Sequence, residues 1–410
     1  MDARPSVIIV GAGIAGLTCA LAMQQRGLKP IVLEQSHALK EIGAGLQLSP
    51  NAMSVLRQLG LEPALLAKGF LPEGIRSVNW RSGQESALLR FASLHFHSPY
   101  LHIHRADLQQ VLLDAVLAND PGCIRTSQHV EAIISEGDGA SLMIRHGDSL
   151  TADWVIGADG IHSRCRDYVV RDNQLPRFTG NVAWRGLLHR DAVPESLLPP
   201  PWANLWMGPG GHVVIYYLRG GELINFVAVR EQSDWQEESW NAPASLRDLL
   251  YDFADWDPTL FELLSHADPK TCYRWALFDR DPISNWYRDR IILIGDAAHP
   301  MLPFLAQGAA MGIEDAWVLS GLIATGAQDA AAQFQQQRAE RCSRVQKLAR
   351  ENMNLFHHHS PLIRAGRDIV ARGLATFSPN MAARRVKWIY DWEPTRITVS
   401  WSRSAGWENR

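Results

Sequence analysis

The residues that point most directly to chemistry form a glycine-rich turn near the start of the chain. Gly11, Gly13 and Gly16 fit the pattern Gly-x-Gly-x-x-Gly, with Ala15 just before the last glycine. The first glycine permits a tight turn, the second lets a pyrophosphate approach the backbone, and the third lets a helix pack closely on a strand. Glu34 lies 18 residues past Gly16, where a carboxylate can accept hydrogen bonds from ribose hydroxyls. The motif predicts a dinucleotide site but does not separate NAD from FAD.

Two later segments combine an apolar run with an acidic turn. Residues 153–158 lead into Asp159-Gly160, and residues 290–294 lead into Gly295-Asp296. An aspartate just past a buried strand can accept a hydrogen bond from a ribityl hydroxyl. The small residues Gly308 and Ala309 would place a helix N-terminus against a ligand, and a flavin needs partial positive charge near the ring that becomes anionic on reduction. These segments favour FAD.

The elements that must position these residues follow from the hydrophobic pattern. Residues 6–34 read as strand, tight turn, helix and strand, which is one βαβ unit of a parallel sheet. Residues 179–230 alternate between apolar and polar and are separated by glycine-rich and proline-rich turns, which is typical of an antiparallel sheet. Helical patterns dominate from about 308 to 375. We therefore expect an α/β fold with an inserted α+β segment.

Together the three motifs resemble the flavoprotein aromatic hydroxylases, or class A flavin monooxygenases. The resemblance runs from Val7 to about Asp391 and is strongest to the salicylate, 3-hydroxybenzoate and 6-hydroxynicotinate hydroxylases. It implies a tight, non-covalent FAD, NADH or NADPH as a transient co-substrate, and O2. It also implies hydroxylation of a small aromatic substrate by a flavin hydroperoxide. The absence of a second glycine fingerprint or a redox cysteine pair disfavours a disulfide reductase.

The resemblance also assigns residues to the cofactor. Glu34 and Gln35 fall at the adenosine positions, and Val130 would offer backbone contacts to the adenine. Arg105, in the stretch His-Arg-Ala-Asp-Leu, would contact the flavin. Asp159 is associated with flavin and nicotinamide binding, and Asp296 would hold the ribityl chain. The residues expected to bind FAD are Gly11, Gly13, Ala15, Gly16, Glu34, Gln35, Arg105, Val130, Asp159, Asp296, Gly308 and Ala309.

The resemblance further implies a Rossmann-like FAD-binding domain interleaved with a mostly antiparallel substrate domain and closed by a C-terminal helical region. The expected segments are 1–75, 100–176 and 278–345 for the FAD-binding domain, 76–99 and 177–277 for the substrate domain, and 346–410 for the helical region.

The substrate is expected to lie between the inserted sheet and the flavin. His212 and Tyr216 are four residues apart in a predicted strand and point to the same face. In the resembling hydroxylases such a pair lines the substrate site, and a histidine can accept a phenol proton near neutral pH. The structural alternative is that His212 is a hydrogen-bonded residue of the sheet.

The opposite wall is expected to be the loop that follows Asp296. Relatives often have a histidine or glutamine where this chain has Pro303 or Phe304, so we expect a more apolar substrate or another polar anchor. Gln47 and Arg185 are candidates for that anchor. Arg185 could pair with a substrate carboxylate, although an outward-facing ion pair is equally compatible with the sequence.

Composition limits the other function classes. The net charge of −3 in 410 residues shows no excess of basic residues of the kind that binds nucleic acid or anionic lipid. No apolar run is long enough to span a bilayer, and the odd number of five scattered cysteines favours reduced thiols in the cytoplasm. We expect no metal, nucleic-acid or membrane partner, and a monomer or homodimer. His299 is interpreted as structural, and His357, His358 and His359 as an exposed helix end.

Two other functions remain open on the sequence. A flavin-dependent epoxidase, or a hydroxylase of a larger non-benzoate substrate, would use the same motifs. A flavin-binding redox sensor without turnover would also bind FAD but would form no hydroxylated product.

Overall fold

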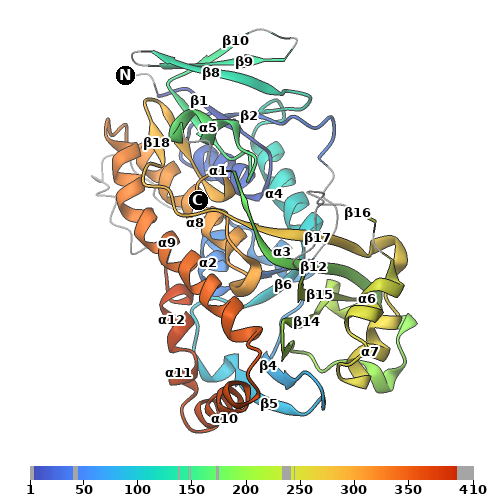
Figure 1. Ribbon diagram of the computed structural model, residues 1–410. Coiled ribbons are helices and arrows are strands. Elements are labelled where there is room, and N and C mark those ends of the chain that lie inside the picture. The colour runs from blue at the N-terminus through green and yellow to red at the C-terminus, as the bar shows by residue number, and fades with distance from the viewer. Residues whose placement is uncertain are drawn as a thin grey trace.

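The protein contains two large β-sheets that lie one above the other, with a long helix along one side (Figure 1). The computed structural model describes residues 4–39, 45–136, 139–145, 147, 149–171, 175–232, 242–243 and 245–394. Both sheets are assembled from segments that lie far apart in the sequence. The α/β fold with an inserted antiparallel sheet and a helical C-terminal part is as predicted.

The upper sheet has six strands in the order β18-β19-β11-β1-β2-β7. All of its pairs are parallel except β18–β19. β1 and β11 are buried along their whole length, as expected for strands covered by helices on both faces. The strands are β1 (Val7–Val10), β2 (Ile31–Leu33), β7 (Ile124–Arg125), β11 (Trp154–Gly157), β18 (Tyr287–Arg288) and β19 (Ile291–Leu293).

Helices cover the upper sheet, and a small meander lies above it. The helices of this part are α1 (Ile14–Gln25), α2 (Pro50–Gln58), α3 (Glu62–Lys68), α4 (Arg105–Asn119), α5 (Arg164–Val170) and α8 (Gly308–Ala324). The meander comprises β8 (Val130–Glu136), β9 (Gly139–Ile144) and β10 (Ser149–Ala152), and a two-stranded ribbon comprises β3 (Gly45–Leu48) and β6 (Leu101–His104).

The lower sheet has eight strands in the order β16-β17-β12-β15-β14-β13-β4-β5. Only its β13–β4 pair is parallel among the described pairs. The strands are β4 (Gly74–Asn79), β5 (Glu85–Arg90), β12 (Arg177–His189), β13 (Ala203–Gly208), β14 (Gly211–Leu218), β15 (Leu223–Glu231), β16 (Ala242–Pro243) and β17 (Tyr273–Asp279). Helices α6 (Leu246–Asp252) and α7 (Pro258–Ser265) contribute to a core against one face of this sheet.

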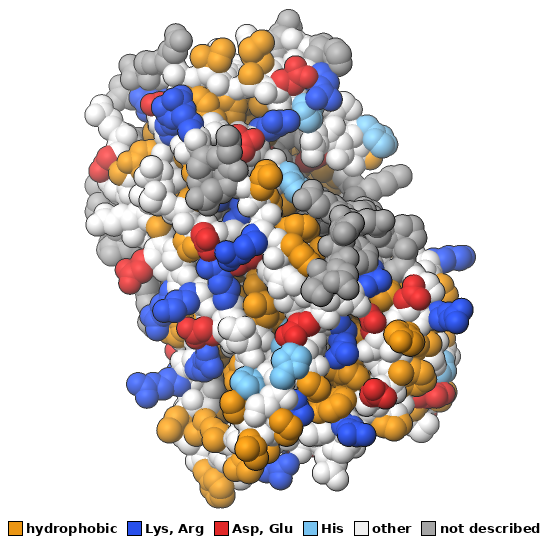
Figure 2. Space-filling view, in the orientation of Figure 1, with side chains coloured by type: hydrophobic (Ala, Val, Ile, Leu, Met, Phe, Trp, Pro, Cys, Tyr) orange, Lys and Arg blue, Asp and Glu red, His pale blue; other side chains and the backbone are white. Residues whose placement is uncertain are grey.

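The C-terminal part is helical, with α9 (Ala330–Phe356), α10 (Pro361–Phe377), α11 (Pro379–Ala382) and α12 (Arg384–Tyr390). The boundary expected after residue 345 falls inside the continuous helix α9. Figure 2 shows hydrophobic side chains gathered at the lower end of the molecule, where Figure 1 places α10 and α11. The exposed apolar side chains of these two helices are Leu362, Ile363, Ile369, Val370, Phe377 and Met381. Among the described residues, no helix is both long and apolar enough to cross a bilayer.

Candidate active site

A first cavity lies at the turn between β1 and α1. This turn cavity has a volume of about 420 Å³, and six of the residues expected to bind FAD line it. They are Gly11, Gly13, Glu34, Gln35, Val130 and Asp159. The carboxyl ends of parallel strands β1, β2 and β11 meet here, which is where ligands bind in sheets of this kind.

The three glycines of the turn have different physical roles. Gly11 has a φ of +102°, and a Cβ there would stand 2.4 Å from the carbonyl oxygen of Ala158. A Cβ on Gly16 would stand 2.0 Å from the carbonyl oxygen of Gly11, so this glycine lets α1 approach the turn. A Cβ on Gly13 would meet nothing within 4 Å. The open space therefore begins at Gly13, the N-cap of α1, whose first-turn N–H groups have no side-chain cap.

Ala15 joins elements instead of lining the turn cavity. Its methyl group lies where the tip of β19 meets α8, because a Cβ added to either Gly295 or Gly312 would come within 3.1 Å of it. Ala15 was expected to bind the cofactor, but it lines neither cavity.

Glu34 and Asp159 hold the turn cavity in shape. The Glu34 carboxylate accepts hydrogen bonds from the backbone N–H groups of Ala12 at 3.0 Å and Ser36 at 2.8 Å. The Asp159 carboxylate accepts from Ser163 Oγ at 2.5 Å and from the N–H groups that begin α5. Burial raises the pKa of Asp159, and these hydrogen bonds oppose the rise. Asp159 thus fixes the loop after β11.

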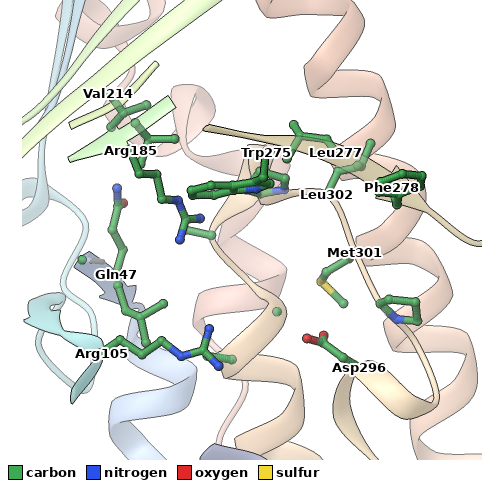
Figure 3. A pocket seen from close by; sticks show the side chains of 18 of the residues that line it. Gln47, Arg105, Arg185, Val214, Trp275, Leu277, Phe278, Asp296, Met301 and Leu302 are labelled. Carbon is green, nitrogen blue, oxygen red and sulfur yellow. The ribbon is translucent and has the colours of Figure 1, made fainter. Parts of the chain in front are cut away.

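A second cavity of about 520 Å³ lies between the two large sheets (Figure 3). The loop after β11 separates this central cavity from the turn cavity, because Ile161 lines the former while Gly160 and His162 line the latter. The predicted residues that line the central cavity are Gln47, Arg105, Arg185, His212, Tyr216, Asp296, Pro303, Gly308 and Ala309. Its volume falls within the roughly 300–1,000 Å³ of small-molecule sites.

Asp296 and Arg105 face each other across one end of the central cavity (Figure 3). Asp296 follows β19 in the short 3-10 helix Gly295–Ala297. Burial raises the pKa of the Asp296 carboxyl, and the charges of His299 and Arg105 oppose this rise. Gly308, the first residue of α8, lies close by, since a Cβ there would be 3.9 Å from Asp296 Oδ1.

Arg185 is a half-buried cation at the other end of the central cavity. Its guanidinium carbon lies 4.5 Å from the centre of the Trp275 ring, and Figure 3 shows both side chains reaching into the cavity. Burial lowers the pKa of Arg185 to about 10. Its Nε atom has no hydrogen-bond partner, and no carboxylate of the described residues forms an ion pair with it. The outward-facing ion pair that the sequence left open is wrong.

Gln47 and Tyr216 form the wall nearest to the ribbon of β3 and β6. The Tyr100 hydroxyl donates to Gln47 Oε1 at 2.7 Å, and Tyr216 also hydrogen-bonds to Gln47. The Tyr216 ring packs against Gly45, where a Cβ would come within 2.7 Å of the ring and hydroxyl. Gln47 is thereby held at the edge of the cavity.

His212 lines the central cavity from β14, on the same face as Tyr216, as predicted from their spacing. Its Nδ1 lies 2.8 Å from Nε2 of His357. His357 is the C-cap of α9 and is buried, so the prediction of an exposed helix end is wrong for this residue. Phe304 was expected to line the central cavity, but it is buried behind the cavity wall, with its ring 5.1 Å from the ring of His212.

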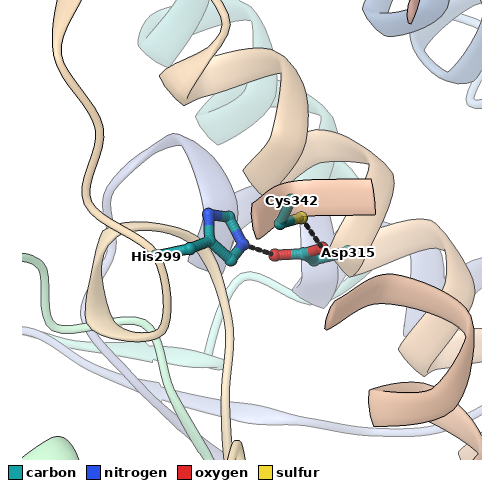
Figure 4. A group of neighbouring side chains, drawn as sticks. All are labelled: His299, Asp315 and Cys342. Carbon is teal, nitrogen blue, oxygen red and sulfur yellow. Dashed lines mark hydrogen bonds and ion pairs between the residues drawn. The ribbon is translucent and has the colours of Figure 1, made fainter. Parts of the chain in front are cut away.

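His299 belongs to a buried charge network with Asp315 and Cys342 (Figure 4). Its Nε2 lies 2.5 Å from Asp315 Oδ2, and Cys342 Sγ lies 4.0 Å from Asp315 Oδ1. These three side chains could in principle ligate a metal. However, Arg338 donates to Asp315 Oδ1 at 2.8 Å and approaches Cys342 Sγ at 3.5 Å, so a fixed cation already neutralises the group. The network supports a structural role for His299.

The same network continues to the start of α8. Arg338 and Arg341 both bind the buried carboxylate of Glu314, which also accepts from Asn51 at 2.7 Å. Gln307, which precedes α8, donates to Ser49 Oγ at 2.8 Å. These contacts fix the N-terminus of α8, and with it Gly308 and Ala309, at the edge of the central cavity.

Residues 4–352 match the family described as "FAD binding domain". The chain belongs to the FAD-binding-domain family. Its curated relatives in this family include a 3-amino-4-hydroxybenzoate 2-monooxygenase of Streptomyces platensis, 37% identical over 86% of this chain and 89% of the relative. A 6-hydroxynicotinate 3-monooxygenase of Bordetella bronchiseptica is 35% identical over 91% and 98% of the two chains. A 3-hydroxybenzoate 6-hydroxylase of Klebsiella oxytoca is 34% identical over 94% and 96%.

Similar solved structures agree with the fold. The complex of HpxO from Klebsiella pneumoniae with FAD and uric acid superposes with a TM-score of 0.82, at 25% identity over 94% of this chain and 95% of that one. A salicylate hydroxylase substrate complex gives a TM-score of 0.81, at 25% identity over 96% and 97%. The predicted FAD cofactor, fold and monooxygenase class are therefore confirmed.

The residues of this FAD-binding-domain chain fit the cofactor. The open space at Gly13 faces the uncapped N-terminus of α1, which suits a diphosphate. The turn cavity and the central cavity lie on either side of one loop, which suits a ligand with an adenosine at one end and a ring system at the other.

Part of the lining of the central cavity was not predicted from the sequence. Tyr273, Trp275 and Leu277 line it from β17. Their spacing of two residues was a readable signal, because alternate residues of a strand share one face. No comparable sequence signal places His357 beside His212, since the contact depends on how α9 crosses the lower sheet.

Proposed function

We propose that this FAD-dependent monooxygenase hydroxylates a small aromatic acid that carries a ring hydroxyl and a carboxylate, with NADH or NADPH and O2 as co-substrates. The observation that carries the choice of an acid is Arg185, a half-buried cation at the cavity, with a buried Nε atom and no carboxylate partner among the described residues. A buried charge is costly unless it is paired. A substrate carboxylate would supply the pair. Relatives named for hydroxybenzoate and hydroxynicotinate substrates are compatible with this choice.

The residues that line the central cavity would each have a different role in binding or activating the substrate. Arg185 would bind the carboxylate, and Gln47 and Tyr216 would orient the ring. His212, from the same strand as Tyr216, would accept the proton of the ring hydroxyl, which makes the ring electron-rich. The apolar side chains of Met301, Leu302 and Pro303 line the opposite wall and would exclude water. Bound FAD supplies the chemistry of hydride acceptance from the nicotinamide and of O2 activation.

The cofactor would be held by the residues that line the two cavities. The uncapped N-terminus of α1 at Gly13 would bind the diphosphate, and Glu34 would bind the adenosine ribose. Asp296 would accept a hydrogen bond from the ribityl chain. Arg105 and the N-terminus of α8 would provide positive charge next to the flavin ring.

We also propose that the protein is cytoplasmic and acts as a monomer or homodimer. All five cysteines are buried free thiols, which supports a reducing compartment such as the cytoplasm. The partners we expect are small molecules, and the chain would act as a monomer or homodimer. Light scattering of the purified protein distinguishes the two states.

The test is a panel of matched acids and amides. NADH and NADPH oxidation by the FAD-loaded protein is measured with 3-hydroxybenzoate, 6-hydroxynicotinate and 3-amino-4-hydroxybenzoate, and with the amide of each. We expect at least one acid to stimulate oxidation and to gain one oxygen atom, as measured by mass spectrometry, while its amide does so far less. Equal stimulation by amides would contradict the role of Arg185. Oxygen insertion only into larger substrates would favour an epoxidase or another hydroxylase, and no product at all would favour a redox sensor.

A further inference from the structure

A line of four ionisable side chains leads from the central cavity to the surface. His212 Nδ1 lies 2.8 Å from His357 Nε2, and His357 Nδ1 lies 3.8 Å from Glu231 Oε1. The other oxygen of this carboxylate, Oε2, lies 2.7 Å from His359 Nε2. His212 and His357 are buried, whereas the Glu231 and His359 side chains are 43% and 71% exposed. The line therefore has one end in the cavity and the other in solvent.

The backbone fixes this arrangement. The N–H group of Gly210 donates to the carbonyl oxygen of His357 at 2.9 Å, and the N–H group of Glu231 donates to the carbonyl oxygen of Gly210 at 2.8 Å. Gly210 has a φ of +64°, and a Cβ there would stand 3.2 Å from both Glu231 Oε2 and His359 Cε1. The turn between β13 and β14 thus ties the end of α9 to the end of β15 and leaves room for the Glu231–His359 pair.

The two buried imidazoles are neutral near pH 7. Burial and the neighbouring His357 hold the pKa of His212 well below its usual value. Burial, together with Arg230 and His359, lowers the pKa of His357 to about 3. A neutral imidazole has one N–H donor and one acceptor nitrogen. Two of them in series can pass a proton along by exchanging tautomers, without either ring keeping a charge in the buried site.

We propose that His212, His357, Glu231 and His359 form a proton-transfer path between the central cavity and solvent. The inference rests on the proposed function, because the ring hydroxyl of the substrate is the source of the proton. His212 would be the residue that touches the substrate, and His357 and Glu231 would act through it. Such a path would carry the proton away from His212, whose lowered pKa makes it too weak a base to keep the proton.

The steps balance as a transfer of one proton. The substrate O–H bond breaks as a bond forms to His212 Nε2, and the Nδ1–H proton of His212 passes to His357 Nε2. The Nδ1–H proton of His357 then passes to the Glu231 carboxylate and from there to His359 or water. Both buried rings end neutral, in the opposite tautomer. The 3.8 Å step from His357 Nδ1 to Glu231 exceeds a hydrogen bond, so the path requires the exposed Glu231 side chain to rotate toward His357.

The experiment uses the FAD-loaded protein and four variants. His357→Gln keeps a polar atom near the position of Nε2, but an amide does not relay protons. Glu231→Gln and the double variant Glu231→Gln/His359→Gln change only exposed side chains. His358→Asn is the matched control, because an Asn oxygen can replace His358 Nδ1, which accepts from the N–H group of Ser360 at 3.1 Å and is outside the path. FAD content and the unfolding midpoint are measured for every variant.

The readout is the rate at which the proton reaches solvent. The protein is mixed with 3-hydroxybenzoate or 6-hydroxynicotinate in weakly buffered solution with a pH indicator, and 3-methoxybenzoate serves as the blank without a ring hydroxyl. We expect His357→Gln to slow proton release at least about tenfold and added imidazole to restore part of the rate. The Glu231 variants should slow release several-fold, and His358→Asn should match the wild type.

Wild-type rates in a folded, FAD-loaded His357→Gln protein would overturn the path. If that variant does not fold, unchanged rates in both Glu231 variants overturn it instead. The proposed function fails separately: in that case the wild type itself releases no proton and forms no hydroxylated product, and the path fails with it. A wild type that hydroxylates, with no variant slowed, refutes the path alone.

Discussion

Replacing Arg185 with methionine should weaken substrate binding and strengthen the substrate-free fold at the same time. Partial burial of the cation lowers the pKa of Arg185 from its usual value to about 10. At about 1.4 kcal/mol per pKa unit, this burial costs the fold about 3 kcal/mol at neutral pH. The contact with Trp275 at 4.5 Å returns about 2 kcal/mol in a desolvated site. Arg185→Met, which keeps an apolar stem, should therefore raise the free energy of unfolding by about 1 kcal/mol.

The effect on binding has the opposite sign. Removing one partner of a buried ion pair costs about 3–5 kcal/mol, because the remaining charge is left uncompensated. The dissociation constant of 3-hydroxybenzoate, or of whichever acid is active, should thus rise at least about 100-fold in Arg185→Met. The corresponding amide has no charge to lose and should bind the two proteins within a few-fold of each other.

The assay combines ligand titration of the FAD-loaded protein with urea unfolding of the ligand-free protein. Arg274→Met is the matched control, because Arg274 lies 4.7 Å from the Trp184 ring and does not line the central cavity. Equal losses of affinity for acid and amide would refute the carboxylate anchor. A loss of more than about 2 kcal/mol of stability in Arg185→Met would refute the claim that its charge is uncompensated without substrate.

Four other substitutions test the cofactor turn and the buried network. Gly13→Ala should change the stability of the apoprotein by no more than about 0.5 kcal/mol but reduce the FAD content of the purified protein severalfold. Gly16→Ala should instead lower the urea midpoint sharply, since its Cβ would lie 2.0 Å from the carbonyl oxygen of Gly11. Arg338→Met should cost about 3–5 kcal/mol in urea unfolding, because it removes the arginine bound to Asp315 and one of the two arginines bound to Glu314; an unchanged midpoint would contradict this. Burial alone would raise the pKa of Asp315, but His299 and Arg338 lower it from 3.8 to about 2. This lowered pKa contributes about 2 kcal/mol to the free energy of unfolding above pH 4, and the contribution should be lost as the pH falls from 4 to 2. When the free energy of unfolding is measured against pH, the Asp315→Asn protein should not show this loss of stability between pH 4 and pH 2.

The sequence was most informative where one residue type is required by local geometry. The turn at Gly11, Gly13 and Gly16 follows from short-range sterics, so its pattern predicted both the βαβ unit and the dinucleotide site. The period of two in β14 likewise predicted that His212 and Tyr216 share a face. These features depend on residues that are close in the sequence.

The sequence was least informative where distant segments meet. Phe304 was assigned to the cavity lining, but the loop after Asp296 turns so that Pro303 faces the cavity and Phe304 packs behind it. The three histidines at 357–359 were interpreted as an exposed helix end, which is wrong for His357. Its burial depends on the angle at which α9 meets β14, and no local pattern records that angle.

Helix α9 makes the two halves of this protein mechanically inseparable. Its 27 residues span about 40 Å, and Figure 1 shows the helix running alongside both sheets. Near its start Arg338 binds the buried carboxylates of α8, further along Arg350 binds Asp279 of β17 at 2.6 Å, and its last turn leads to His357. A rod with anchors in both halves should make them unfold in one cooperative transition. An engineered chimera that exchanges the substrate half between relatives would therefore have to carry residues 330–356 with it.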